Sequence, residues 1–337
     1  MSNYKDVETK WVITLFCVTL LGLVAVLSVV ITQSRTPTPL FTTWDSLEPD
    51  KWSSIWLIKR HIAPNAIIEV RPTGDPFIEG VTFGVPQAKY KRSSNQSTFE
   101  SLLAGFDQQD RTLQRLGKII TAIETTAWNT ANDPMVYLIE QQFRLLQDRY
   151  SRVNVPLACY GHFFDVLYDQ LLTNVDRKQL QQKLGQAIND QQCDSMPAMA
   201  QRKHANRVAE LPIDQLLSEI AFNRQVIFVD TREPAEYSKS HIPGAINLPM
   251  RHLDQSDYDQ LKQADLVISY CVKDFRGYEV ARQMLDNGIA NVAVMKPHGL
   301  SGWFASGLPL TTKQTSEKQA LHQLMQCAKE PQLCKPA

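Results

Sequence analysis

Apolar residues are spaced in three different ways along the chain, and each spacing predicts a different kind of element. Residues 11–32 form an uncharged, mostly apolar run, which at about 1.5 Å per residue is long enough to cross a hydrocarbon core of roughly 30 Å. Apolar positions at helical spacing dominate residues 50–172, whereas short continuous apolar runs dominate residues 226–295. We therefore predict an N-terminal transmembrane helix, an α-rich α+β first domain and an α/β second domain.

The first domain is predicted to be mainly helical. Pro64 ends its first helix, and Ser97 with Glu100 three residues later fits a capping box that begins the second. The spacing predicts helices over residues 50–62, 97–106, 112–126, 134–149 and 157–172. Two short apolar runs, at 66–70 and 81–85, predict strands that give the domain a small β component.

The second domain alternates apolar strands with helices. The strands are predicted over residues 226–229, 266–270 and 291–295. This alternation is typical of a doubly wound parallel sheet, in which ligands bind at the carboxyl ends of the strands. Asp230, Arg232 and Cys271 all follow strand ends, so we expect them on one edge of the sheet.

The same patterns set the domain limits. They divide the chain into a transmembrane anchor (1–35), a first domain (36–175), a polar linker (176–206), a second domain (207–315) and a C-terminal tail (316–337). The linker is rich in Gln and Lys, which is typical of a partly helical, flexible connection. The tail has apolar residues at helical spacing and is predicted to form a short helix.

Composition narrows the function classes and suggests a location. The chain has 337 residues, 43% of them hydrophobic, and a formal net charge of +0, which indicates a globular protein and no nucleic-acid partner. Lys5 and Lys10 precede the apolar run and Arg35 follows it. The positive-inside rule then favours a single-pass protein of the inner membrane whose bulk lies on the periplasmic or extracytoplasmic side.

The six cysteines fall into three groups. Cys17 lies in the apolar run, and Cys271 follows a predicted strand. The other four are Cys159, Cys193, Cys327 and Cys334. Cys327 and Cys334 flank a short segment and could form a disulfide in an oxidising compartment. The alternative is four ordinary reduced thiols, because sequence does not show which sulfur atoms are within bonding distance.

Cys271 is the candidate nucleophile. The apolar run 266–270 leads directly into Cys271 and a short loop, after which a helical pattern begins at Gly277. A helix N-terminus and the cations Lys273 and Arg276 favour the thiolate, which is the reactive form of cysteine. The alternative is a buried structural cysteine.

Three stretches of the second domain resemble the motifs of a rhodanese domain. They are Asp230-Thr-Arg232 with the following His241-Ile-Pro-Gly, the Cys271 loop, and residues 294–309. The resemblance implies a sulfurtransferase that needs no cofactor and uses a persulfide on Cys271.

The resemblance also implies roles for the neighbours of Cys271. It places Lys273, Asp274 and Arg276 at the substrate. Asp230 and Arg232 follow a strand end on the same edge of the sheet, and we expect them to hold this rim together by hydrogen bonds rather than to touch the substrate. Active members commonly carry glycine where this chain has Asp274 and serine where it has Gly277. A carboxylate at 274 should raise the thiol pKa and weaken the attraction for an anionic sulfur donor.

The first domain resembles the chromate-resistance protein family. The similarity rests on residues 50–66, 97–103 and 161–168 and covers 44–174. Residues 89–95 replace the His-containing, glycine-rich segment of that family, so no metal site is predicted.

Basic residues offer a different kind of site in the first domain. Lys59, Arg60, Lys89 and Arg92 could converge on chromate or another oxyanion, and a solvated basic face is the alternative. His162 and Asp165 are one helical turn apart and could be ligands or an acid–base pair, or each could make an ordinary hydrogen bond.

Two hypotheses for function follow. The first is a membrane-anchored sulfurtransferase, linked to chromate resistance, that takes sulfur from a sulfane-sulfur donor and passes it to a thiol acceptor. The second is a non-catalytic, chromate- or redox-responsive binding protein with a degenerate rhodanese module, in which Asp274 marks lost catalysis.

Overall fold

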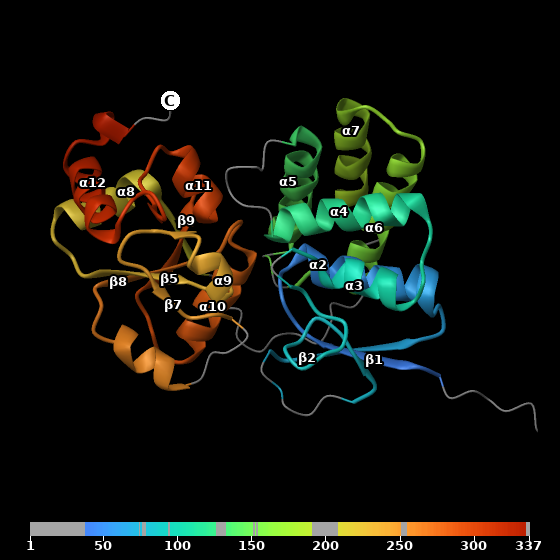
Figure 1. The fold of residues 1–337 in the computed structure, drawn as a ribbon. Coiled ribbons are helices and arrows are strands. Elements are labelled where there is room, and N and C mark those ends of the chain that lie inside the picture. Colours follow the sequence, from blue (N-terminus) through green and yellow to red (C-terminus); the bar gives the residue numbers. More distant parts are fainter. Residues whose placement is uncertain are drawn as a thin grey trace, which may run out of the picture. The chain divides into compact units, whose positions relative to one another are not determined.

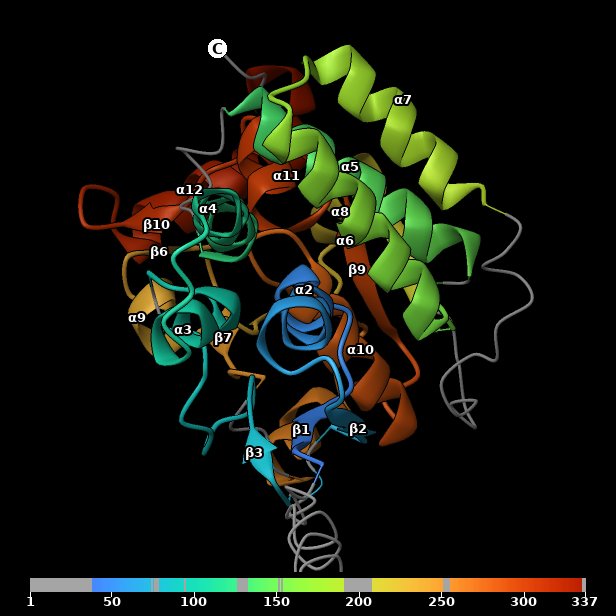
Figure 2. The same ribbon diagram turned by 90° about the vertical axis from the view of Figure 1, so that its right-hand side faces the viewer.

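The computed structural model describes residues 38–73, 75, 79–93, 95–125, 133–150, 152, 154–190, 208–250 and 255–334. Leu40–Ala337 form one compact unit. We call residues 40–190 the first half of this unit and residues 208–334 the second half (Figures 1 and 2).

The predicted fold class is corrected at its transmembrane helix. Among the described residues, no helix is long and apolar enough to cross a membrane. The longest of them, α5 (Pro134–Arg149) and α6 (Leu157–Leu172), have 16 residues each. A helix of that length spans about 24 Å, which is short of a hydrocarbon core of roughly 30 Å. The predicted span, residues 11–32, lies outside the described residues.

The first half combines a small parallel sheet with a set of packed helices. The sheet has the order β2 (Ile67–Arg71), β1 (Leu40–Trp44), β3 (Val81–Thr82). The helices are α2 (Pro49–Leu57), which continues as the π-helical turn η1 (Ile58–Ile62), α3 (Thr98–Gly105), α4 (Arg111–Thr125), α5, α6 and α7 (Arg177–Ile188). The α-rich character with a small β component is therefore confirmed, and β1 is a strand that the apolar pattern did not predict.

Local sequence signals begin two of these helices. The Ser97 hydroxyl accepts a hydrogen bond from the backbone N–H of Glu100, as a capping residue does. The reciprocal bond of a capping box is replaced, because the Ser97 N–H donates to the Thr121 hydroxyl at 3.0 Å. Asp133 caps α5 in the same way as Ser97 caps α3.

Helix α7 occupies the start of the predicted polar linker. Asp176 caps it, and Leu180 and Leu184 are buried where it packs against α5 and α6. The remainder of the linker, residues 191–207, lies outside the described residues.

The second half is the predicted doubly wound α/β structure. Its main sheet has five parallel strands in the order β4 (Ala209–Pro212), β9 (Val292–Lys296), β8 (Leu266–Tyr270), β5 (Val226–Asp230), β7 (Ile246–Asn247). Its helices are α8 (Ile213–Ala221), α9 (Pro234–Tyr237), α10 (Phe275–Asp286), α11 (Gly299–Ala305) and α12 (Glu317–Lys329). The short strands β6 (Ser240–His241) and β10 (Thr311–Thr312) pair antiparallel, and the 3-10 turns are η3 (Gln255–Leu261) and η4 (Pro331–Cys334).

The two faces of this sheet belong to different hydrophobic cores. Helices α8, α11 and α12 cover one face, where Trp303 packs edge-on against Phe228. On the other face, the apolar side of α10 belongs to the same core as the helices of the first half. Cys271 follows the carboxyl end of the central strand β8. This end of the sheet therefore lies where the two halves pack against each other.

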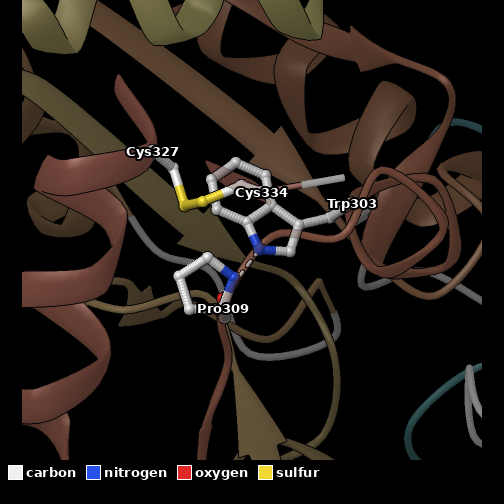
Figure 3. The surroundings of a disulfide bond; sticks show 4 residues. All are labelled: Trp303, Pro309, Cys327 and Cys334. Carbon is white, nitrogen blue, oxygen red and sulfur yellow. Dashed lines mark hydrogen bonds between the residues drawn. A yellow bond between two sulfur atoms is a disulfide. The ribbon is translucent and has the colours of Figure 1, made fainter. Parts of the chain in front are cut away.

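The predicted tail disulfide is present. Cys327 of α12 is joined to Cys334 of η4, with their Cα atoms 5.5 Å apart, beside the indole of Trp303, which donates to the Pro309 carbonyl at 2.8 Å (Figure 3). Cys159 is a buried free thiol. Cys17 and Cys193 lie outside the described residues.

Candidate active site around Cys271

Strand β8 and helix α10 place Cys271 at the carboxyl end of the parallel sheet. Strand β8 ends at Tyr270, and α10 begins at Phe275. The backbone N–H of Asp274 donates to the Cys271 sulfur at 3.1 Å. Gly277 lets the first turn of α10 approach the strand, because a Cβ atom there would lie 2.7 Å from the Cα of Tyr270. The helix N-terminus is thus held against the sulfur.

The surroundings of the thiol act in opposite directions on its pKa. Cys271 is only 3% exposed, and this burial raises the pKa of the thiol, with a smaller contribution in the same direction from Asp274. The Arg276 guanidinium and the N–H of Gly277 lower the pKa. Burial has the largest effect, so the pKa of Cys271 is raised above its usual value. The thiol form is therefore favoured in this arrangement.

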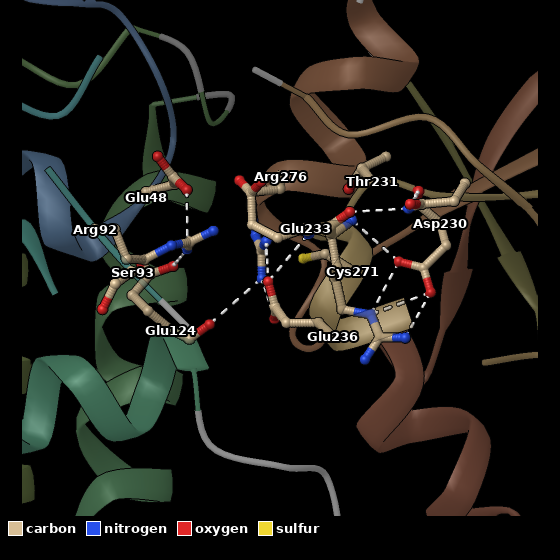
Figure 4. A network of polar contacts seen from close by, with 12 residues as sticks. Glu48, Arg92, Ser93, Glu124, Asp230, Thr231, Glu233, Glu236, Cys271 and Arg276 are labelled. Carbon is tan, nitrogen blue, oxygen red and sulfur yellow. Dashed lines mark hydrogen bonds and ion pairs between the residues drawn. The ribbon is translucent and has the colours of Figure 1, made fainter. Parts of the chain in front are cut away.

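Arg276 is paired with Glu236, a residue that the sequence did not single out. Its two terminal nitrogens each lie 3.1 Å from a carboxylate oxygen of Glu236, and one of them also lies 3.4 Å from the carbonyl oxygen of Glu124 in the first half. Figure 4 shows the guanidinium between these two residues. Although burial alone would raise the pKa of Glu236, Arg276 lowers it to about 2. Much of the cationic charge expected to face a donor is therefore compensated.

Lys273 and Asp274 point their side chains at the first half. The Lys273 ammonium lies 3.1 Å from a carboxylate oxygen of Glu140 on α5. The Asp274 carboxylate lies 3.4 Å from Arg144 and 3.3 Å from Arg152. Burial would raise the pKa of Asp274, but these two arginines hold it below its usual value. Neither side chain is directed at a small donor beside the sulfur.

Asp230 and Arg232 form an ion pair at the end of β5. The guanidinium of Arg232 lies 2.5 Å from the carboxylate of Asp230 and donates to the Ser240 carbonyl at 2.6 Å. Both side chains are buried. The pair connects the carboxyl end of β5 to β6. Its contacts are those of a structural support at this end of the sheet.

The four candidate oxyanion ligands of the first half do not all line one cavity. Arg92 is buried between Glu48 and Glu124, at 3.3 and 3.0 Å (Figure 4). The ammonium of Lys89 lies over the ring of Tyr90. Lys59 donates to backbone carbonyls, and Arg60 makes a two-bond contact with Asp165.

Lys59 and Arg60 instead line a cavity of about 440 Å³ between α2 and α6. Apolar side chains such as Ile55 and Leu157 also line it, together with His162 and Asp165. These two do not contact each other as a pair: His162 lies 3.5 Å from Asp190, and Asp165 accepts from Trp56 and Arg60. Every charged group named here has a partner of its own.

Family models match both halves of the chain. The model described as "ChrB, C-terminal domain" matches residues 41–171, and the model described as "Rhodanese-like domain" matches residues 213–306. The second match contains the Cys271 loop, Glu236 and the Asp230–Arg232 pair.

Curated relatives resemble the second half. A protein named "Sulfurtransferase" from Allochromatium vinosum is 30% identical over 107 residues, which cover 32% of this chain and 98% of that protein. A "Thiosulfate:glutathione sulfurtransferase" from Saccharomyces cerevisiae is 34% identical over 94 residues, which cover 24% of this chain and 67% of that protein. The crystal structure of a thiosulfate sulfurtransferase from Pseudomonas aeruginosa matches 31% of this chain and 20% of its own, with 22% identity and a TM-score of 0.28.

Proposed function

We propose that this chain, which belongs to the rhodanese-like family through its second half, transfers sulfane sulfur by way of a persulfide on Cys271. One observation carries the proposal. The Cys271 sulfur accepts the Asp274 N–H at 3.1 Å at the N-terminus of α10, and N–H groups of such a loop stabilise an anionic sulfur atom.

The proposed reaction has two steps. The Cys271 thiolate attacks the outer sulfur of a donor such as thiosulfate, a sulfur–sulfur bond forms, and the bond within the donor breaks so that sulfite leaves with the electron pair. A thiolate acceptor then attacks the outer sulfur of the persulfide, and Cys271 leaves as the thiolate. No external oxidant or reductant is required.

The length of the loop supports sulfur transfer. Four residues separate Cys271 from Arg276, as in sulfur-transferring rhodaneses, whereas phosphatase relatives of this fold use one more residue. Thiosulfate and glutathione occur in the names of the relatives, and we use them as the first donor and acceptor to test.

The test is the intact mass of the full chain before and after exposure to thiosulfate. We expect a gain of one sulfur atom that is removed by glutathione and is absent from Cys271→Ser. Cys159→Ser is the matched control, because Cys159 is also a buried free thiol and should leave the gain unchanged. Absence of any adduct in the wild-type chain, with thiosulfate and with a persulfide donor, would refute the proposal.

A second candidate is a non-catalytic, chromate- or redox-responsive binding protein. The burial of Cys271 and the pairing of Arg276 with Glu236 favour it, because a donor must reach the sulfur. The link to chromate rests on the "ChrB, C-terminal domain" match. An unreactive Cys271 in a chain that is otherwise folded would support this candidate.

A further inference from the structure

The loop that carries Cys271 is covered by the first half. All of residues 271–276 are buried, although this edge of a parallel sheet is where ligands normally enter. Part of the cover is α5, where the ring of Phe143 packs edge-on against Phe275 with centroids 5.9 Å apart. Cys271 itself is only 3% exposed, so little of it is open to a sulfur donor in this arrangement.

Charged residues of the first half hold the loop at two adjacent positions. Arg144 of α5 donates to the carbonyl oxygen of Lys273, and Glu140, one turn earlier, pairs with the Lys273 ammonium at 3.1 Å. Arg144 and Arg152 then converge on the Asp274 carboxylate, at 3.4 and 3.3 Å. Two cations of the first half therefore share one anion of the loop.

Arg152 also contacts the helix behind the loop. Its guanidinium lies over the ring of Tyr278 on α10, 3.8 Å from the centroid, and its side chain is 5% exposed. The Asp274 carboxylate additionally faces His298, at 3.5 Å. Because these groups are desolvated together, loss of one partner weakens the compensation of the charges that stay buried.

The backbone at Asp274 supports the same conclusion. Asp274 has a φ of 84°, in the left-handed region where glycine is the usual residue. A glycine would adopt this conformation without strain but would offer nothing to Arg144 and Arg152. The aspartate thus keeps the turn and adds an anion that the first half binds.

We propose that Arg144 and Arg152, acting through Asp274, form a lock that holds the Cys271 loop closed under the first half. Sulfur donors then reach Cys271 only after the lock opens. This inference rests on the proposed function, and it assigns control of that site to the contact between the halves. Arg144 and Arg152 are positioning residues, since neither touches the sulfur.

The test measures how fast iodoacetamide, a small neutral reagent, labels Cys271 in the full chain, with the labelled peptides quantified by mass spectrometry. We expect R144M/R152M to raise the rate about tenfold or more, because a broken buried pair favours local opening. The matched control is R149M on the same helix, whose guanidinium binds the Ile188 carbonyl of α7; it should leave the rate unchanged. The labelling rate of Cys159, which is 1% exposed in α6, reports general loosening.

A second arm tests whether the arginines act through Asp274. In the D274N background, R144M/R152M should produce little further acceleration, because the anion that they hold is already gone. An unchanged or slower rate in R144M/R152M, a full additional effect in D274N, or an equal acceleration of Cys159 would each overturn the lock. The readout needs no sulfur donor, so it decides the lock even if no persulfide forms on Cys271.

Discussion

Replacing Asp274 with glycine should destabilise the protein, although the backbone alone favours glycine there. A non-glycine residue in the left-handed region costs about 1–2 kcal/mol, and Asp274 pays that cost at a φ of 84°. If only the backbone mattered, Asp274→Gly would increase the free energy of unfolding by about 1 kcal/mol.

The side chain reverses this sign. The Asp274 side chain is 1% exposed and faces both Arg144 and Arg152, and removing one member of a buried ion pair costs about 3–5 kcal/mol. Both arginines retain a second carboxylate, Glu140 and Glu210 respectively, so the lower end of that range applies. Subtracting the backbone gain leaves a net loss of about 2 kcal/mol for Asp274→Gly.

Equilibrium unfolding in urea measures this loss, and the chain offers a matched control. Asp107 is also an aspartate in the left-handed region, with a φ of 49°, but its side chain is exposed and accepts a hydrogen bond from Gln109 instead of binding a buried cation. We expect Asp107→Gly to be neutral or slightly stabilising. Finding Asp274→Gly as stable as the wild type, or more stable, would refute the ion-pair reasoning.

Two further predictions concern the packing and the buried charges. Gly277→Ala should lower the free energy of unfolding by about 1–3 kcal/mol, because the new Cβ would lie 2.7 Å from the backbone of Tyr270. The control, Gly161→Ala, has open space around its Cβ and should be neutral or stabilising. Equal urea midpoints for the two variants would contradict this prediction. Burial and Glu48 raise the pKa of Glu124 from its usual 4.5 to about 8. Between those pH values the folded chain keeps a proton that the unfolded chain releases, so this residue makes stability fall as pH rises. Between pH 5 and pH 8, the urea midpoint should fall less steeply with pH in Glu124→Gln than in the wild type. Identical slopes would contradict the raised pKa of Glu124.

Elements with a strong local signal were predictable. Strand β8 and helices α5 and α6 have the limits that their apolar patterns predict, because a buried strand needs a continuous apolar run and a packed helix needs a periodic one. Strand β1 was missed because Thr42 and Thr43 are polar, yet both are fully buried. The Thr43 hydroxyl donates to the Phe83 carbonyl at 2.7 Å, a contact across 40 residues that no local pattern predicts.

The same distinction between local signals and contacts of distant residues applies to the candidate site. Cys271 and Arg276 could be identified from the sequence because a strand, a loop and a helix follow one another there. Glu236 at least lies within the Glu-Pro-Ala-Glu stretch of the second half. Arg144 and Arg152, by contrast, belong to another part of the chain and approach Asp274 across more than 120 residues, so no motif relates them to the loop.

Asp274 shows what a sequence pattern leaves out. In the sequence, Asp274 is an anion close to Cys271, whose thiolate is stabilised by cations. From the sequence alone it therefore suggests lost catalysis. In the folded chain, Arg144 and Arg152 compensate its charge, while Glu236 and Glu140 compensate Arg276 and Lys273. All three charges of the loop are thus balanced by residues outside it. Under the proposed lock, the reactivity of Cys271 depends on whether the two halves stay in contact, and a departure from glycine at one position then reflects control of the site rather than its loss.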